Sequence, residues 1–219
     1  MAAEKTPIEE TNLSGIDKLQ QTYEQNASAI NIGLITVLVL VAGLLYYVKV
    51  LQPQKEIQAQ EAIFQAQYYF EQDSFQLALN NGLIDVAQNF SGTKAGKLAH
   101  YYAGISYFNL GDFNSAIYYL SKFKSNDNLL NALAQGALAD AQMESGDTNS
   151  ALASYKKSTS ITKNKTIAPI LLYKAALAHE KNGKNQEAYN LFKEIKDNYP
   201  NSDQARDIEK YLGRVKASL

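Results

Sequence analysis

Two short patterns around the histidines resemble catalytic sites, and each lacks a residue that the chemistry needs. His179-Glu180 begins like the helix of a zinc protease, in which a second histidine ligand follows four residues after the first. Gly183 occupies that position instead. Neither His100 nor His179 is accompanied by a carboxylate and a nucleophile, so we expect both histidines to be structural.

Two further patterns resemble phosphate or acyl-transfer chemistry. The segment 92–97 reads like a phosphate-binding loop, but it is one residue short of the required spacing, and Leu98 follows where a hydroxyl would hold magnesium. Ser154 and Lys157 have a spacing that chance produces in a helix containing serine and lysine. The chain has no cysteine, which excludes disulfides, thiolate catalysis and cysteine-ligated metals. We therefore expect no enzyme activity, no metal and no cofactor.

One apolar segment is long enough to cross a membrane. The run from Ile30 to Val48 contains 19 residues and no charge. As a helix rising about 1.5 Å per residue, it would span roughly 28 Å. Tyr46 and Tyr47, followed by Lys49, are typical of a membrane interface. The segment is longer than the apolar core of a signal peptide and follows an acidic stretch, so an uncleaved anchor is predicted.

The orientation of this anchor is only weakly indicated by nearby charge. Lys18 lies on its N-terminal side, whereas Lys49 and Lys55 lie on its C-terminal side. The positive-inside rule therefore leans very slightly toward a cytoplasmic C-terminal domain.

The tail before the anchor has a helical pattern of its own. Leu13, Ile16, Leu19 and Tyr23 recur at spacings of three, three and four. This predicts a short amphipathic helix that lies on the membrane surface or against a partner, with a partly ordered tail as the alternative.

The sequence after the anchor repeats one pattern: a helix end, a glycine turn and a helix start. The turn glycines Gly111, Gly146 and Gly183 lie 35 and 37 residues apart, and an alanine follows each of them after five residues. A weaker copy contains Ala78, 38 residues before Ala116. Glycine permits the left-handed backbone that ends a helix, while alanine allows two antiparallel helices to approach closely. A large residue four positions beyond each alanine fills the remaining space: Leu120, Tyr155 and Phe192.

This pattern resembles the tetratricopeptide repeat (TPR) family, whose unit is about 34 residues long. The shared features are small pairs in the first helix, a tyrosine one turn later and a closing proline; the family's tryptophan is absent, and one repeat has the proline. These positions are Ala103-Gly104, Ala175-Ala176, Tyr69, Tyr107 and Pro200. The resemblance implies an all-α fold, with one N-terminal transmembrane helix followed by an α-solenoid of about four helix pairs and a C-terminal capping helix.

The predicted domain organisation follows directly. Residues 1–29 form the tail, 30–48 the transmembrane helix and 49–219 the TPR-like domain. Its repeats cover about 57–92, 97–130, 132–165 and 168–201, and the capping helix covers 202–216, with Ser202 as its N-cap.

The resemblance also implies a protein-binding groove, because the first helices of TPR units line a concave surface that holds peptides or helices. The residues at these positions are mostly aromatic and aliphatic, and the basic set that clamps a peptide carboxylate is absent, so an apolar segment or partner helix is expected. The alternative is that neighbouring repeats or the capping helix cover them. The groove positions are Ile63, Gln67, Phe70, Tyr101, Ile105, Phe108, Met143, Tyr173 and Leu177, with Asp140, Glu144 and Glu180 beside them.

One family combines these parts in the same order. The exit from the membrane at 44–48 and the Gln/Ala-rich helix Gln52–Gln67 make the chain similar to the ancillary subunit of the bacterial SecYEG translocon. That resemblance implies a single-pass protein of the bacterial inner membrane with a periplasmic domain. Its partners would be the translocon, a membrane-anchored periplasmic chaperone or isomerase, and unfolded secreted chains, toward which it would act as a holdase.

One class of partner is excluded, and one alternative function is left open. The net charge of −1 gives no reason to expect nucleic acid as a partner. The alternative function is a structural adaptor in another bacterial envelope complex, which would bind through its anchor or its convex face.

Overall fold

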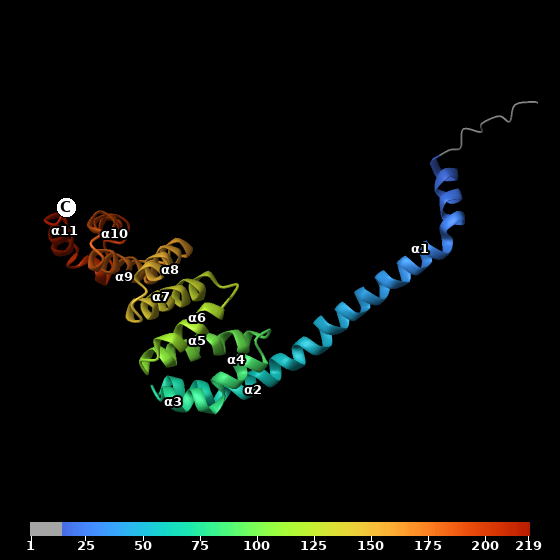
Figure 1. Ribbon diagram of the computed structural model, residues 1–219, viewed down its shortest axis with the longest axis horizontal. Helices are drawn as coiled ribbons and strands as arrows, with labels where there is room; N and C mark the ends of the chain where they lie inside the picture. The colour runs from blue at the N-terminus through green and yellow to red at the C-terminus, as the bar shows by residue number, and fades with distance from the viewer. Residues whose placement is uncertain (1–14) are drawn as a thin grey trace, which may run out of the picture. The chain divides into compact units, whose positions relative to one another are not determined.

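The computed structural model describes residues 15–219, with the side chains of Gly15 and of 19–219 (Figure 1). The chain divides into two units, which meet between Pro53 and Gln54. The regular secondary structure of the described residues is helical, with turns between the helices and no strand, so the predicted all-α fold is confirmed.

The first unit is dominated by one long helix, α1 (Gly15–Tyr46), followed by a π-helical turn, Tyr47–Leu51. Asn26 interrupts α1 with non-helical backbone angles, and its side-chain amide donates to the carbonyl of Thr22 at 3.0 Å. A side chain that bonds the backbone in this way competes with the helical ladder and bends the helix.

The predicted anchor, residues 30–48, lies in the apolar part of α1 and in the first two residues of the π-helical turn. Among the described residues, one stretch of helix, within Leu19–Glu71, is long and apolar enough to cross a membrane, and its most apolar window is wholly exposed. In the predicted amphipathic tail, Leu13 and the side chain of Ile16 lie outside the described residues, while Leu19 and Tyr23 are exposed. The surface role of this tail remains a prediction.

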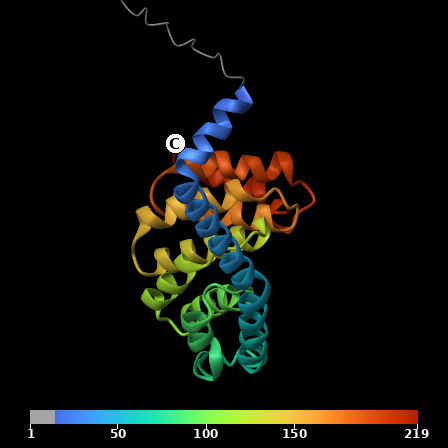
Figure 2. The same ribbon diagram turned by 90° about the vertical axis from the view of Figure 1, so that its right-hand side faces the viewer.

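The second unit is a stack of antiparallel helices, which Figure 2 shows rising from α2 to α11. Helix α2 starts at Gln52, five residues before the first predicted repeat, and α11 covers most of the predicted capping segment. The helices are α2 (Gln52–Glu71), α3 (Phe75–Ala78), α4 (Ile84–Asn89), α5 (Lys94–Asn109), α6 (Phe113–Lys122), α7 (Asn128–Glu144), α8 (Thr148–Ile161), α9 (Ile167–Lys181), α10 (Asn185–Asn198) and α11 (Ile208–Lys216).

The glycine turns have the backbone that the repeat pattern predicts. Gly111, Gly146 and Gly183 adopt φ values of 80°, 86° and 69°. In the first copy the same position is Asp73, which adopts φ 53° without being glycine. Aspartate is among the few residues that tolerate this region, so the turn is retained where glycine is absent.

The repeat alanines form the seams of the stack. Ala116, Ala151 and Ala188 are 0% exposed, and the large residues four positions later are buried beside them. In the first copy, the position four beyond Ala78 is Gly82, within the π-helical turn Leu79–Leu83 that separates α3 from α4. Gly82 has φ +136°, and a β-carbon there would lie 2.7 Å from the carbonyl oxygen of Ala62 on α2. The second helix of this pair is therefore broken where it crosses α2.

The core is a series of clusters, each shared by consecutive helices. The first joins α2 to α6, the next two continue through α7, α8 and α9, and the last packs α9, α10 and α11 around Phe192. Helix α11 closes the stack by burying Ile208, Leu212 and Val215 and exposing its charged side. A core in which each helix pair buries its apolar side chains against the next pair is typical of a solenoid.

The start of the capping segment differs from the sequence prediction. Ser202 does not cap a helix with its side chain; its hydroxyl donates to the carbonyl of Tyr199 at 2.8 Å. A short 3₁₀ turn, Asp203–Ala205, follows, and α11 starts only at Ile208. The hydroxyl is used to close the turn after α10, so it does not accept from the backbone of α11.

Candidate functional site

A hollow of about 280 Å³ lies where the first helices of three successive pairs, α5, α7 and α9, meet. We call it the groove hollow. Helix α5 forms one wall, α7 the floor and α9 the other wall. It is lined by Tyr101, Ile105, Phe108, Asn109, Leu133, Gly136, Ala137, Asp140, Ile170, Leu171 and Lys174.

The α5 wall is apolar and held in place by its own helix pair. Tyr101, Ile105 and Phe108 follow one another at spacings of four and three, which places them on one face of the helix. The ring of Tyr101 packs 5.5 Å from that of Phe123, and the ring of Phe108 packs 5.7 Å from that of Phe113. Burial raises the pKa of Tyr101, and nearby Tyr102 adds to the effect. These partly exposed side chains are therefore positioned before any partner binds.

The floor of the hollow exists because α7 presents small residues there. Gly136 has no side chain, and a β-carbon at this position would lie 2.5 Å from a methyl carbon of Leu171 on α9. Helices α7 and α9 therefore pack closely through Gly136 and leave the space above Ala137 free.

One end of the hollow carries a neutralised ion pair. The Lys174 ammonium donates to one carboxylate oxygen of Asp140 at 2.6 Å, and the hydroxyl of buried Tyr155 donates to the other. Burial, and then the adjacent Asp140 carboxylate, raise the pKa of Tyr155, so its hydroxyl keeps its proton and remains a donor. The hollow is thus an apolar surface with a charge-balanced rim, which matches an apolar side chain better than a terminal carboxylate.

The structure brings only part of the predicted groove together. Tyr101, Ile105 and Phe108 share the groove hollow with Asp140. Ile63 is only 2% exposed and belongs to the core under α2, so it does not form an open surface. Phe70 packs 4.6 Å from the ring of Tyr102, outside the hollow.

The remaining predicted positions also lie apart from the groove hollow. Gln67 is half-buried on α2, beside Tyr102. Met143 is half-buried in the cluster shared by α7, α8 and α9, and the nearby Glu144 is exposed at the end of α7. None of these three side chains lines the groove hollow.

The C-terminal end of the predicted groove is covered by α11. The ring of Tyr173 packs edge-on against Tyr211 of α11 at 5.2 Å, and Leu177 is half-buried in the same cluster. Glu180 accepts two hydrogen bonds from the Arg214 guanidinium, both at 2.6 Å. The capping helix therefore covers this end of the predicted groove, which is the alternative that the sequence left open.

Sequence reasoning missed the α9 wall of the hollow and its small-residue floor. Ile170 and Lys174 face the hollow from α9, and Gly136 and Ala137 form the floor. One signal was available: Lys174 follows Asp140 by 34 residues, as Arg214 follows Glu180 by 34. An acidic residue with a basic one a repeat later predicts an ion pair between adjacent first helices.

The sequence patterns that resemble catalytic sites have structural roles. In the loop that resembles a phosphate site, the Thr93 hydroxyl accepts from the backbone of Gly96 at 2.9 Å and so caps α5. The Glu56 carboxylate accepts from the backbone N–H groups of Lys94 and Ala95, at 2.6 and 3.1 Å. An acidic side chain of α2 therefore already occupies this helix N-terminus.

His100 is buried and His179 is half-buried. Nδ1 of buried His100 lies 2.9 Å from the Gly96 carbonyl, which can only accept, so this nitrogen donates. Burial lowers the pKa of His179. Within the described residues, no group of three or more His, Cys, Asp or Glu side chains could hold a metal ion.

Comparisons with known proteins agree with the repeat fold. The family described as a tetratricopeptide repeat-like domain matches residues 20–168, and one described as a tetratricopeptide repeat matches 171–202. A crystal structure of TPR-like repeats from a kinesin light chain of Podospora anserina has a TM-score of 0.58 at 17% identity, over 74% of this chain and 86% of that one. No curated protein matches the chain. Because the first match covers more than half of the sequence, the chain belongs to the tetratricopeptide repeat-like family.

Proposed function

We propose that this protein is a membrane-anchored scaffold that holds an apolar segment of another protein in the groove hollow. The observation that carries the proposal is the hollow itself, in which the α5 wall of Tyr101, Ile105 and Phe108 faces Ile170. Between the two walls, α7 presents the small residues Gly136 and Ala137. Preformed apolar hollows of this kind receive the anchor side chains of a bound peptide or helix.

The partner's chemistry follows from the lining. Because Asp140 and Lys174 neutralise each other, the hollow offers no net charge to a charged group. An aromatic or branched aliphatic side chain would displace water from the α5 wall, and polar atoms near it could bond the exposed Asn109. The scaffold therefore selects apolar segments, the feature that unfolded chains and docking helices share.

We further propose the translocon as the setting, on the resemblance in the sequence. The apolar helix supports an anchor in the bacterial inner membrane. The domain would then lie in the periplasm, where a partner chaperone or isomerase and emerging secreted chains would meet it. The slight excess of lysine after the anchor favours the opposite orientation, so topology is tested separately, by protease protection of the C-terminal domain.

The binding proposal is tested by one groove variant and one matched control. Phe108→Glu places a charge in the groove hollow, whereas Asn114→Glu places the same charge on the exposed surface of α6. Both are purified from native membranes in mild detergent through a C-terminal tag, and their helical content is compared by circular dichroism. We expect Asn114→Glu to retain the partners of the parent chain and Phe108→Glu to lose them.

A photo-crosslinking residue in place of Ile105 gives a second measurement, which does not require the fold to tolerate an introduced glutamate. Recovery of translocon subunits in that crosslink would support the secretion setting. Equal recovery of partners by the two charge variants, together with no crosslink from Ile105, would reject the groove proposal and leave an anchored repeat protein of another complex.

The adaptor function is a second candidate, because one apolar surface lies outside the groove. Ile57, Phe64 and Tyr68 on α2 are 57%, 74% and 58% exposed and lie opposite the core-facing Ala59 and Ile63. An adaptor would bind through this outer face. Retention of partners by Phe108→Glu and their loss in Phe64→Glu would favour it.

A further inference from the structure

A patch of five lysines lies at the edge of the repeat unit where α5 starts and α6 and α8 end. Lysines link three neighbouring hollows of about 370, 400 and 500 Å³: the first two share one lysine, and the last two share another. We call these lysines the basic patch; they are Lys94, Lys97, Lys122, Lys124 and Lys157.

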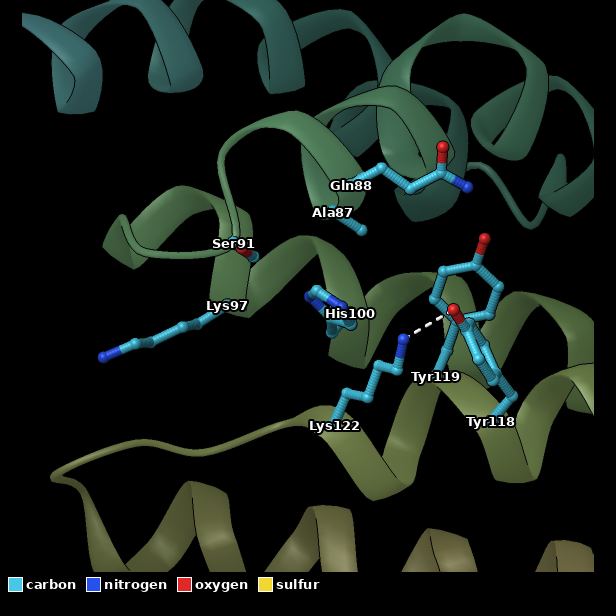
Figure 3. Close-up of a pocket in the computed structure, with 8 residues that line it drawn as sticks. All are labelled: Ala87, Gln88, Ser91, Lys97, His100, Tyr118, Tyr119 and Lys122. Atoms are coloured by element: carbon cyan, nitrogen blue, oxygen red, sulfur yellow. Dashed lines mark hydrogen bonds between the residues drawn. The ribbon is translucent and has the colours of Figure 1, made fainter.

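The first of these hollows is polar and has no acidic side chain in its lining (Figure 3). His100 lies at its centre, Lys97 extends outward from α5, and Lys122 turns toward Tyr118. The Lys122 ammonium donates to the Tyr118 hydroxyl and lies 3.8 Å from the centre of that ring. Its contact is thus with an uncharged phenol, which leaves its positive charge unbalanced.

The carboxylates near the patch are used elsewhere. Asp127 is the one acidic residue in the three linings, and it caps α7 by accepting from the backbone of Leu129 and Leu130, at 2.7 and 3.2 Å. Glu56 binds the N-terminus of α5. In the part of the chain that the structure describes, none of the five lysines forms an ion pair.

Lysines of the C-terminal pairs provide the contrast. Lys163, Lys193 and Lys196 are paired with Glu194, Asp197 and Glu209. These three lysines therefore have carboxylate partners, which the five lysines of the basic patch lack.

The opposite edge of these pairs has the opposite sign. The turns there carry acidic side chains and no lysine: Asp73, Asp112, Glu144 and Asp147. The two helices of each pair are antiparallel, so the start of the first helix and the end of the second lie at one edge, where the lysines are. The turn between the two helices lies at the other edge, where the acidic residues are. This part of the unit is thus electrostatically polarised along its helices.

We infer that the basic patch binds the phosphate groups of anionic phospholipid headgroups. Glu56 follows Val48, the end of the apolar run, by eight positions. A chain of that length spans at most about 28 Å. Glu56 is hydrogen-bonded to the start of α5, so the patch is tethered within reach of a bilayer that holds the apolar run. An acidic protein could also complement the lysines, but the bilayer is the partner that this chain's own covalent connection keeps near the patch.

The inference rests on the membrane anchor in the proposed function, and the test separates the two. The chain contains no cysteine, so one introduced thiol carries the only label. Ser91→Cys places a fluorophore at the Figure 3 hollow with every lysine retained, and Ser145→Cys places it on the acidic edge. The full chain is reconstituted into phosphatidylcholine vesicles with or without about 30% phosphatidylglycerol, together with a headgroup-attached quencher.

We expect the label at Ser91→Cys to be quenched at least about threefold more in anionic than in neutral vesicles, and the excess to disappear near 0.5 M salt. The label at Ser145→Cys should show no such difference. Since each lysine near an anionic surface contributes about fivefold in association, Gln at Lys94, Lys97, Lys122 and Lys124 together should abolish the excess.

The other outcomes overturn the inference in distinguishable ways. Equal quenching in both vesicle types, in a chain that floats with both, rejects the lipid site and leaves the anchor intact. A chain that binds inorganic phosphate but shows no lipid-dependent quenching has a site for a free anion instead. If the chain fails to float with neutral vesicles, the anchor is rejected; the lipid site then stands only if flotation appears with anionic vesicles and is lost in the four-lysine variant.

Discussion

Substitution of Gly96 tests most directly whether the end of α4 packs against the start of α5. Gly96 lies in the segment that resembles a phosphate loop, but in the structure it allows two backbone segments to approach closely. A β-carbon on Gly96 would lie 1.8 Å from the carbonyl oxygen of Phe90 and 2.9 Å from the backbone nitrogen of Ser91. The glycine is required because the chain leaving α4 passes directly against the first turn of α5.

The expected cost of Gly96→Ala follows from those contacts. The obstructing atoms are backbone, so no side-chain rotation relieves the clash, and overpacking of this kind costs about 1–3 kcal/mol. The Phe90 carbonyl also accepts from the backbone and hydroxyl of Thr93, at 2.8 and 2.7 Å, and displacing it weakens two bonds of about 1 kcal/mol each. Replacing a helical glycine by alanine returns about 1 kcal/mol. The net loss is therefore about 3 kcal/mol in the free energy of unfolding.

The matched control is Gly213→Ala on α11, where an added β-carbon meets nothing within 4 Å. It should stabilise the chain by about 0.5–1 kcal/mol, because it gains helix propensity without a clash. Both variants are unfolded in urea as full chains in mild detergent and followed by circular dichroism. A Gly96→Ala protein as stable as Gly213→Ala would show that α4 and α5 do not approach as described, and the reasoning on this loop would be wrong.

Three further predictions concern stability. Glu56→Ala should lower the free energy of unfolding by about 1–2 kcal/mol, with Glu56→Gln intermediate, because the start of α5 loses its charged acceptor; urea titration measures this. Arg214→Ala should lower the free energy of unfolding by about 1 kcal/mol, a value reduced by the partial exposure of its ion pair with Glu180, and should speed hydrogen exchange in α11. Arg206→Ala should change neither quantity, since both partners of its ion pair are exposed. Burial lowers the pKa of His179, so the unfolded chain takes up the proton first and stability should fall as pH drops below about 6.5. His179→Asn should flatten that dependence, and an unchanged pH profile would assign it to other groups.

Much of the fold could be predicted because its signals are local. Each turn needs a residue that adopts a left-handed backbone, which glycine does most easily. The position five residues later needs a small side chain, and both requirements hold whatever lies elsewhere in the chain. The same logic found the apolar helix and the solenoid. It failed at Ser202, where a hydroxyl competent to cap a helix bonds the preceding turn instead. Local chemistry permitted both uses, and only the packing of α10 against α11 selected one.

The candidate site was less predictable, because openness depends on helices distant in sequence. Tyr101 and Tyr173 occupy equivalent predicted positions, but the first lines a hollow and the second is covered by Tyr211. The residues of the following helix decide between them: α7 presents Gly136 and Ala137 at the hollow, whereas α11 presents Tyr211 to Tyr173.

The sequence by itself determined the apolar helix, the repeat period and the class of surface presented by the first helices of each pair. Residue type and spacing are sufficient for these, since each depends on contacts within about one repeat. Only the tertiary structure decided which of those surfaces stays open, which glycine relieves a close backbone approach, and which lysines lack a carboxylate. Each of these depends on segments that approach one another only after the helices have stacked, so no local pattern encodes it.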